Sequence, residues 1–211
     1  MMATIGIGAS ARILDIEKKD VEKLFKNRFK KKGKKVIDSN IKAFSKGYDY
    51  VKNLDFKKIK KTKEKNAILI NGNTAIAIGA IRAGCQFMSS YPMTPATSIM
   101  QYLAGRQESH DLLVYQSEDE ISALNNGLGA SFAGVRSLVA TSGGGFALMN
   151  ETLSLSGCSE TPIVLVVASR PGPGTGLPTR TEQSDLRFAI HAGHGEFQRV
   201  ICAPGDPHEC F

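Results

Sequence analysis

Short apolar segments that alternate with helical patterns constrain the fold of this chain more than any other feature. Six such segments follow one another from Asn66 onward, at residues 67–70, 85–89, 112–116, 137–141, 163–168 and 200–202. Strands that are apolar along their whole length are usually buried on both faces. Joined by helices, such strands form a parallel sheet. The pattern therefore predicts an α/β fold, with a mostly parallel sheet and helices on both of its faces.

Charge divides the chain where this pattern begins. Residues 1–65 hold 18 Lys and 2 Arg against 8 acidic residues, a net charge of +12, whereas residues 66–211 hold no Lys and carry a net charge of −5. A basic arm can bind nucleic acid or an acidic partner such as a nucleotide phosphate or ferredoxin. However, the lysines interleave with a helical apolar pattern that includes Val21, Leu24 and Phe25. That arrangement is typical of solvated faces of packed helices, so we expect no nucleic acid partner.

The pattern of residues 1–52 is typical of the end of a domain. Helices are expected at about 15–29 and 39–51, and two short helices cannot bury a core alone. We therefore expect residues 1–52 to complete a domain, 53–65 to be a lysine-rich linker, and 66–211 to form the α/β domain. Asp206-Pro207 is a good helix start, with Asp at the N-cap and Pro at N1. Because the chain stops four residues later, we expect the second domain to be truncated at its C-terminus.

Membrane and metal functions are not indicated. No apolar run reaches the roughly 20 residues that span a bilayer. The first ten residues lack the positive start of a signal peptide, so a cytoplasmic location is expected. The cysteines lack the close spacing of zinc or iron–sulfur sites. Glycines surround His194 and indicate a turn, so we do not expect His191, His194 and Glu196 to bind a metal.

Two motifs open predicted helices directly after predicted strands. In Tyr91-Pro-Met-Thr-Pro95, Thr94 is expected at the N-cap and Pro95 at N1. An N-terminus of this kind can receive a carboxylate or phosphate, although an ordinary cap explains the pattern as well. Ser117-Glu-Asp-Glu120 has the spacing of a capping box, with Ser117 at the N-cap and Glu120 at N3. The helix that follows is rich in small residues, which lets a flat ligand approach closely.

Two further motifs follow later strands. Ser142-Gly-Gly-Gly145 lies between a strand and a helix, where it could admit a phosphate or a close backbone, but it is not a Walker motif. The loop 170–183 lies at the carboxyl end of a predicted strand, where open α/β sheets bind ligands. Its arginines, Arg170 and Arg180, suggest anion recognition, although they could also be solvated side chains of a surface loop.

Taken in order, these motifs resemble the alpha subunit of 2-oxoacid:ferredoxin oxidoreductases. The matching stretches are Tyr91-Pro-Met-Thr-Pro-Ala96, Glu118-Asp-Glu-Ile121, Ala140-Thr-Ser-Gly143, Gly174-Thr-Gly-Leu-Pro-Thr-Arg-Thr-Glu-Gln183 and Gly193-His-Gly-Glu196. The family usually has Ser-Gly-Pro-Gly where this chain has Ser142-Gly-Gly-Gly. Residues 1–52 resemble the end of the gamma domain, which some members fuse ahead of alpha.

The resemblance implies a pyrimidine-binding domain for thiamine diphosphate. Glu120 resembles the catalytic glutamate that hydrogen-bonds N1′ of the aminopyrimidine. Thr94 resembles the residue that contacts the 2-oxoacid. Arg180, with Arg170 as a second candidate, resembles the arginine that binds the substrate carboxylate. Further contacts with the cofactor are implied for Tyr91, Pro92, Ser142 and Gly143.

The implied reaction is oxidative decarboxylation of a 2-oxoacid with CoA, which gives acyl-CoA, CO2 and reduced ferredoxin. A beta subunit would complete the site and carry the diphosphate-bound Mg²⁺ and an iron–sulfur cluster. Two alternatives stay open: the half-domain of another thiamine-diphosphate enzyme, and a non-catalytic α/β remnant.

Overall fold

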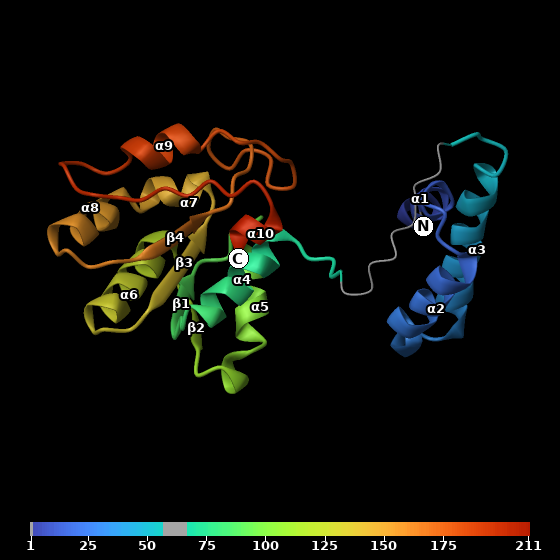
Figure 1. The fold of residues 1–211 in the computed structure, drawn as a ribbon, viewed down its shortest axis with the longest axis horizontal. Coiled ribbons are helices and arrows are strands. Elements are labelled where there is room, and N and C mark those ends of the chain that lie inside the picture. The colour runs from blue at the N-terminus through green and yellow to red at the C-terminus, as the bar shows by residue number, and fades with distance from the viewer. Residues whose placement is uncertain (1, 57–66) are drawn as a thin grey trace. The chain divides into compact units, whose positions relative to one another are not determined.

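The computed structural model describes residues 2–56 and 67–211. The chain forms two compact units, Met1–Ala67 and Ile68–Phe211 (Figure 1). Most of the linker expected at 53–65 lies outside the described residues, so its boundaries stay a prediction.

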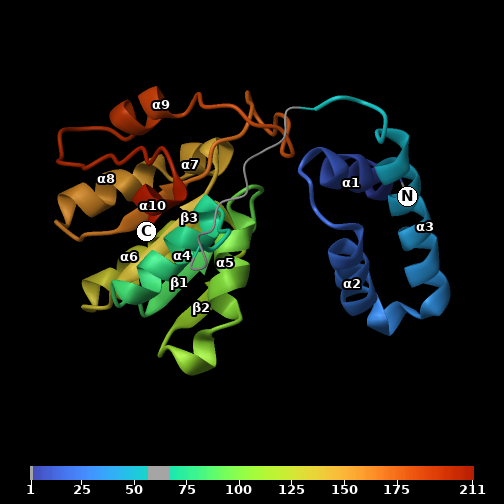
Figure 2. The same ribbon diagram turned by 45° about the vertical axis from the view of Figure 1, so that its right-hand side comes forward.

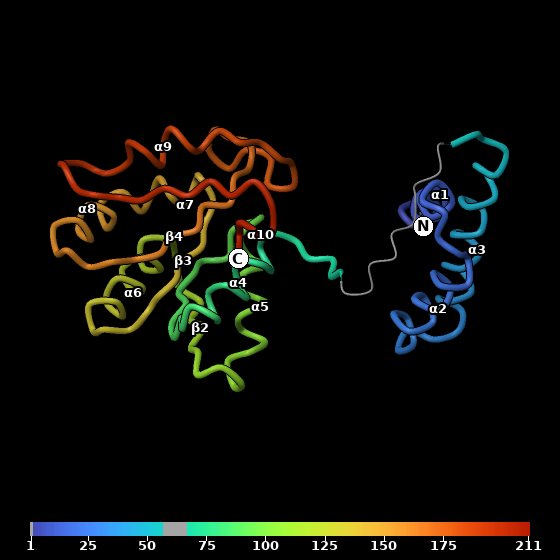
Figure 3. The backbone as a smooth tube through the Cα atoms, in the orientation of Figure 1, coloured from blue at the N-terminus to red at the C-terminus, as the bar shows by residue number. Residues whose placement is uncertain are grey.

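The N-terminal unit is helical, as expected. Helix α1 (Met2–Ile13) packs against α3 (Lys34–Tyr50), and α2 (Lys18–Arg28) and the short 3-10 helix η1 (Lys30–Lys32) connect them (Figure 3). Its small core consists of Ala11, Val21 and Phe44, with Phe25 and Tyr48 packed beside it. Two glycines allow the close approach of α1 and α3. A Cβ atom at Gly47 would clash with the Ile5 carbonyl oxygen, and one at Gly8 with the Phe44 carbonyl oxygen.

The second unit is built on a parallel sheet with the strand order β2-β1-β3-β4. Within the described residues its strands are β1 (Phe87–Ser90), β2 (Leu113–Gln116), β3 (Ser137–Thr141) and β4 (Val164–Val167). Every pair is parallel, and Met88 of β1 lies in register with Val114 on one side and Leu138 on the other. The predicted parallel sheet is confirmed.

Two of the six predicted strands are wrong. Residues 67–70 and 200–202 form no strand. Leu69 and Val200 are almost fully exposed, so these apolar runs are not packed within the described chain. An apolar run becomes a strand only where a neighbouring strand supplies hydrogen-bond partners, and the sequence pattern does not show whether one is present.

Helices cover both faces of the sheet, as predicted (Figures 1 and 2). Helices α4 (Gly72–Arg82) and α5 (Thr97–Ala104) pack on one face, where Leu138 and Ala140 of β3 point. Helix α6 (Glu120–Phe132) packs on the other face, where Val139 points, and α8 (Asn150–Cys158) contacts α6. Because successive side chains of β3 point to opposite faces of the sheet, they contribute to two separate apolar clusters.

The remaining helices are short. The helix expected after the glycines 143–145 is divided at Met149 into α7 (Gly143–Leu148) and α8. Helix α9 spans Leu186–His191 and the 3-10 helix η2 spans Gln107–Ser109. Helix α10 (Pro207–Cys210) is capped by Asp206, whose carboxylate accepts from the amides of His208 and Glu209, as predicted. In the described ranges, no helix is long and apolar enough to cross a membrane.

The contact between α1 and α3 leads to a stability prediction. Gly47→Ala forces a methyl group into the Ile5 main chain and should lower the free energy of unfolding by about 1–3 kcal/mol. Gly6→Ala is the matched control, because nothing lies within 4 Å of its Cβ position. It should stabilise α1 by about 0.5–1 kcal/mol. Urea unfolding followed by circular dichroism measures both; equal effects of the two substitutions would contradict the packing.

Candidate functional site

The carboxyl ends of all four strands lie at one edge of the sheet, because every strand pair is parallel. The chain leaves β1 through α5 toward β2, whereas it leaves β3 through α7 and α8 toward β4. The boundary between β1 and β3 is therefore a topological switch point, where open α/β sheets form a ligand crevice. Each residue predicted for the site lies on one of the segments that follow these strands.

Glu120 is the first residue of α6, and only 5% of the residue's surface is exposed. Its carboxylate makes no hydrogen bond to another residue in the described part of the chain. The space for this side chain exists because residue 145 is glycine. A Cβ atom there would lie 2.6 Å from Cγ of Glu120 and would clash with the Thr141 hydroxyl. On a residue this deeply buried, a carboxylate without a protein donor is available to a ligand.

The predicted capping box is wrong in its register. Asp119 is the N-cap of α6; its carboxylate accepts from the Ser122 amide at 2.7 Å, and the Ser122 hydroxyl accepts from the Asp119 amide. The Ser122 amide lowers the pKa of Asp119. Ser117 is buried instead, and its Oγ lies 2.7 Å from Oγ of Ser89. Glu120 is therefore at N1 and has no capping role.

Thr94 is not the predicted helix cap. Helix α5 begins at Thr97 with Ala96 at the N-cap, because the preceding residues form a separate turn in which the Thr97 amide donates to the Met93 carbonyl. The Thr94 side chain is exposed at the sheet edge, beside exposed Tyr91 and half-buried Pro92. The loop is thus available to a ligand, but not through a capped helix N-terminus.

Unpartnered polar atoms gather at the same edge. In residues 2–56 and 67–211, the buried side-chain atoms without a hydrogen-bond partner are Oγ of Ser142, Nε of Arg170 and Oδ2 of Asp185. Ser142 follows β3, Arg170 follows β4, and the Asp185 carboxylate lies against Gly143. Burying a polar group without a partner costs on the order of 1–3 kcal/mol. A bound ligand or a water molecule would supply the missing hydrogen-bond partner.

The two candidate arginines differ in their surroundings. Arg170 is half-buried, and its Nη1 donates to the Thr94 carbonyl oxygen at 2.8 Å. Arg180 is exposed, and its side chain forms no hydrogen bond or ion pair with the described residues. Its main chain is held in the loop by a hydrogen bond to the Leu177 carbonyl. Arg180 therefore has all of its side-chain donors available.

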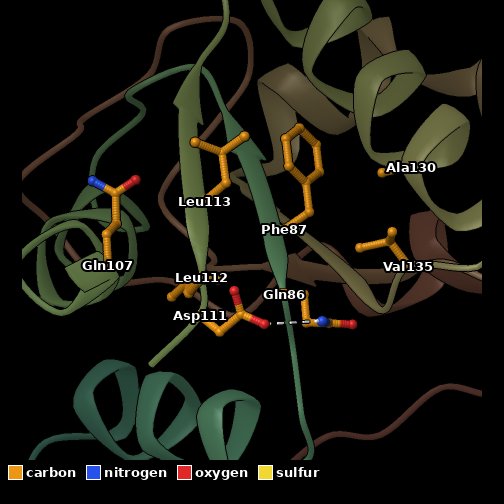
Figure 4. Close-up of a pocket in the computed structure, with 8 residues that line it drawn as sticks. All are labelled: Gln86, Phe87, Gln107, Asp111, Leu112, Leu113, Ala130 and Val135. Atoms are coloured by element: carbon orange, nitrogen blue, oxygen red, sulfur yellow. Dashed lines mark hydrogen bonds between the residues drawn. The ribbon is translucent and has the colours of Figure 1, made fainter. Parts of the chain in front are cut away.

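A hollow of about 450 Å³ lies at the opposite edge of the sheet (Figure 4). Its lining includes Phe87 and Leu113, the first residues of β1 and β2, and Gln86, whose amide lies 3.5 Å from the Asp111 carboxylate. No predicted site residue lines it. We place the candidate site at the carboxyl edge, because the buried unpartnered atoms lie there.

Metal-binding residues do not cluster in the described ranges, where no group of three His, Cys, Asp or Glu side chains could hold an ion. His194 lies 3.1 Å from Glu151 of α8, and its amide donates to Ser154. The turn at Gly193-His-Gly-Glu196 is thus pinned to α8.

Three residues at the edge were missed by sequence reasoning: Asn73, Gly145 and Asp185. Gly145 was visible only as part of a glycine run. Asn73 lies in the first turn of α4, where an Asn suggests a local cap, yet its amide bonds the loop after β1. Asp185 occupies the N-cap position of α9 without capping it. These contacts join distant segments, so local patterns do not reveal them.

Comparison with known proteins shows the family to which the chain is similar. Residues 78–211 match the family described as "Pyruvate flavodoxin/ferredoxin oxidoreductase, thiamine diP-bdg", and residues 1–50 match "Pyruvate ferredoxin/flavodoxin oxidoreductase". The chain is 45% identical over 71% of its length to 2-oxoacid:ferredoxin oxidoreductase 1, subunit alpha, of Sulfurisphaera tokodaii. It is 43% identical over 67% of its length to 2-oxoglutarate synthase subunit KorA of Methanothermobacter thermautotrophicus.

A solved structure resembles nearly the whole chain. The 2-oxoglutarate:ferredoxin oxidoreductase from Magnetococcus marinus, with 2-oxoglutarate, coenzyme A and succinyl-CoA bound, matches 98% of this chain with a TM-score of 0.81 and 39% identity. The chain spans 37% of that structure's chain, 26% of the Sulfurisphaera subunit and 38% of the Methanothermobacter subunit.

The packing of Glu120 leads to a prediction with a neighbouring control. Gly145→Ala should lower the free energy of unfolding by about 1–3 kcal/mol, because the new methyl group overlaps Glu120 and Thr141. Gly144→Ala should be neutral or stabilise by up to about 1 kcal/mol, because its Cβ would meet only the Gly174 carbonyl oxygen, at 3.5 Å. Thermal and urea unfolding of both variants compare the two sites. A tolerated Gly145→Ala would show that Glu120 does not occupy this space.

Proposed function

This chain belongs to the pyruvate ferredoxin/flavodoxin oxidoreductase family, and on that premise we propose that it supplies the pyrimidine-binding half of a thiamine-diphosphate site. The enzyme it serves would oxidatively decarboxylate a 2-oxoacid with CoA, giving acyl-CoA, CO2 and reduced ferredoxin. The observation that carries the proposal is Glu120 at the carboxyl edge of a parallel sheet, a residue that is largely buried and whose carboxylate has no hydrogen-bond partner among the described residues.

The residues at this edge fit the pyrimidine end of the cofactor. An aminopyrimidine is flat and needs a carboxylate at N1′, which Glu120 can provide. Gly143 and Gly145 leave room at the first turn of α7 for the side chains of Asp185 and Glu120, and the buried Oγ of Ser142 lacks a protein partner. Tyr91 and Pro92 flank the opposite side of the switch point on the loop after β1. These features support cofactor contacts by Tyr91, Pro92, Glu120, Ser142 and Gly143.

The cofactor, when bound, supplies the nucleophile and the electron sink that decarboxylation requires. The task of Glu120 is to hold a proton between its carboxylate and N1′. Burial suits this task, because a short hydrogen bond to a carboxylate is stronger where water is excluded. Asp119, and not Glu120, caps α6, so the position of Glu120 is set by a helix terminus that is stable without it.

The substrate would enter from the exposed side of the same edge. Thr94 is exposed there, and Arg180 has a guanidinium with its donors available. A planar guanidinium can bind a carboxylate with two parallel hydrogen bonds, and every 2-oxoacid offers that carboxylate. We therefore favour Arg180 over Arg170 as the carboxylate ligand.

The proposed site needs a partner subunit. The residues described here include no cluster of acidic metal ligands for a diphosphate-bound Mg²⁺ and no paired cysteines for an iron–sulfur cluster. We propose that a beta subunit brings both and that ferredoxin receives the electrons there. The cytoplasm is the proposed location of the complex.

Glu120→Gln in the complete enzyme should reduce turnover about 100-fold or more and leave the chain folded. The amide keeps the shape of the side chain but cannot hold the proton at N1′. Glu118→Gln, at an exposed position two residues earlier, should leave turnover unchanged. The measurements are 2-oxoacid-dependent dye reduction and thermal unfolding. Normal turnover by a folded Glu120→Gln enzyme would falsify the catalytic role.

Arg180→Lys should raise the KM for the 2-oxoacid by about 10-fold or more, because lysine loses one of two charge-assisted hydrogen bonds. The Kd for thiamine diphosphate, measured by calorimetry, should change little. Arg187→Lys, on exposed α9, is the control and should leave both constants unchanged. Equal losses in substrate and cofactor binding would count against a carboxylate-binding role.

A further inference from the structure

The main chain of the loop after β1 has every carbonyl from Met93 to Ala96 occupied. The Met93 carbonyl accepts from the Thr97 amide, and the Ala96 carbonyl accepts from the Ile99 amide. Both of these bonds are local to the turn. The two carbonyls between them, of Thr94 and Pro95, accept from side chains of distant segments. The ends of the turn are therefore held locally, and its centre is held from outside.

Arg170 holds the first central carbonyl. Its Nη1 donates to the Thr94 oxygen at 2.8 Å across 76 positions of sequence. Arg170 follows β4 and Thr94 follows β1, and these strands are separated in the sheet by β3. The bond thus links the two sides of the switch point. A guanidinium occupied in this way has fewer donors left for a substrate than Arg180 has.

Asn73 holds the second central carbonyl from another segment of the chain. Its Nδ2 donates to the Pro95 oxygen at 2.9 Å and to Oγ of Ser98 at 2.8 Å. Both hydrogens of the amide are used, and because a carbonyl can only accept, the Nδ2 atom must face Pro95. Asn73 belongs to α4, so the loop is tied to a helix that packs on the sheet.

We propose that Asn73 and Arg170 are positioning residues. They hold the Tyr91–Pro95 loop by the carbonyls of Thr94 and Pro95 and so fix the Thr94 hydroxyl for the 2-oxoacid. The inference rests on the proposed function. Proline fixes the dihedral angles within the loop, but it does not orient the loop relative to the sheet. The two tethers do so, because one comes from α4 and the other from the end of β4.

The test is steady-state kinetics of the complete enzyme with Asn73→Ala and Arg170→Met. Each should lower kcat between about 10-fold and about 100-fold, the cost of a catalytic group displaced by about 1 Å. The Kd for thiamine diphosphate should stay within about 3-fold. Arg170→Lys should retain most of the activity, because a single donor is enough for a main-chain carbonyl. A carboxylate clamp would instead need the whole guanidinium fork.

Coupling to Thr94 separates positioning from general stability. In a Thr94→Val background the hydroxyl is absent, so Asn73→Ala and Arg170→Met should lower the residual kcat less than about 3-fold. In an Arg180→Lys background each should keep its full effect. Effects that multiply independently of Thr94→Val would overturn the inference.

Matched controls come from the same unit. Asn125 also donates two hydrogen bonds, to Ile121 and Thr152, and half-buried Arg199 also donates one to a main-chain carbonyl, that of Ala189. Asn125→Ala and Arg199→Met remove equivalent bonds away from the loop and should leave kcat unchanged. If the tether variants behave like these controls while Glu120→Gln is inactive, the inference fails and the proposed function stands. If Glu120→Gln and Thr94→Val are both fully active, the proposed function fails.

Discussion

Parallel pairing of the strands is the constraint on which the rest of the structure depends. It sends the segments after β1, β2, β3 and β4 to one edge of the sheet, although they are far apart in sequence. The strand order then places the switch point between β1 and β3, where the chain leaves in opposite directions. Without this pairing, Thr94, Glu120 and Ser142 would share only a common local pattern.

At this edge, polar side chains occupy the space that a Cβ atom would fill if the glycines were other residues. Gly145 leaves room for Glu120 and the Thr141 hydroxyl, and Gly143 leaves room for the Asp185 carboxylate. Close packing of this kind allows a carboxylate to be buried, but it does not supply the donor that a buried carboxylate needs. The carboxyl edge is therefore closely packed, but some of its polar atoms lack hydrogen-bond partners. In the hollow at the amino ends of β1 and β2, by contrast, the side chains of Gln86 and Asp111 bond to each other.

The division of roles among similar residues follows from their surroundings. Asp119 and Glu120 are adjacent acids, yet one caps α6 in solvent and the other is buried against α7. Arg170 and Arg180 share a loop, yet one is bound to a main-chain carbonyl and the other is exposed. In both pairs the chemical type is the same, and burial and bonding partners separate a structural side chain from one available to a ligand.

The sequence by itself determined the α/β class, the six apolar runs from which the four strands come, the helical N-terminal unit and the segments that carry the candidate site, because periodicity and apolar runs are local properties. Only the tertiary structure decided which apolar runs become strands: among the described residues, no strand pairs with 67–70 or 200–202. It also decided that Asp119 rather than Ser117 caps α6, and that Asn73 reaches Pro95. These outcomes depend on hydrogen bonds and packing between distant segments, and the local spacing of residues does not predict such contacts.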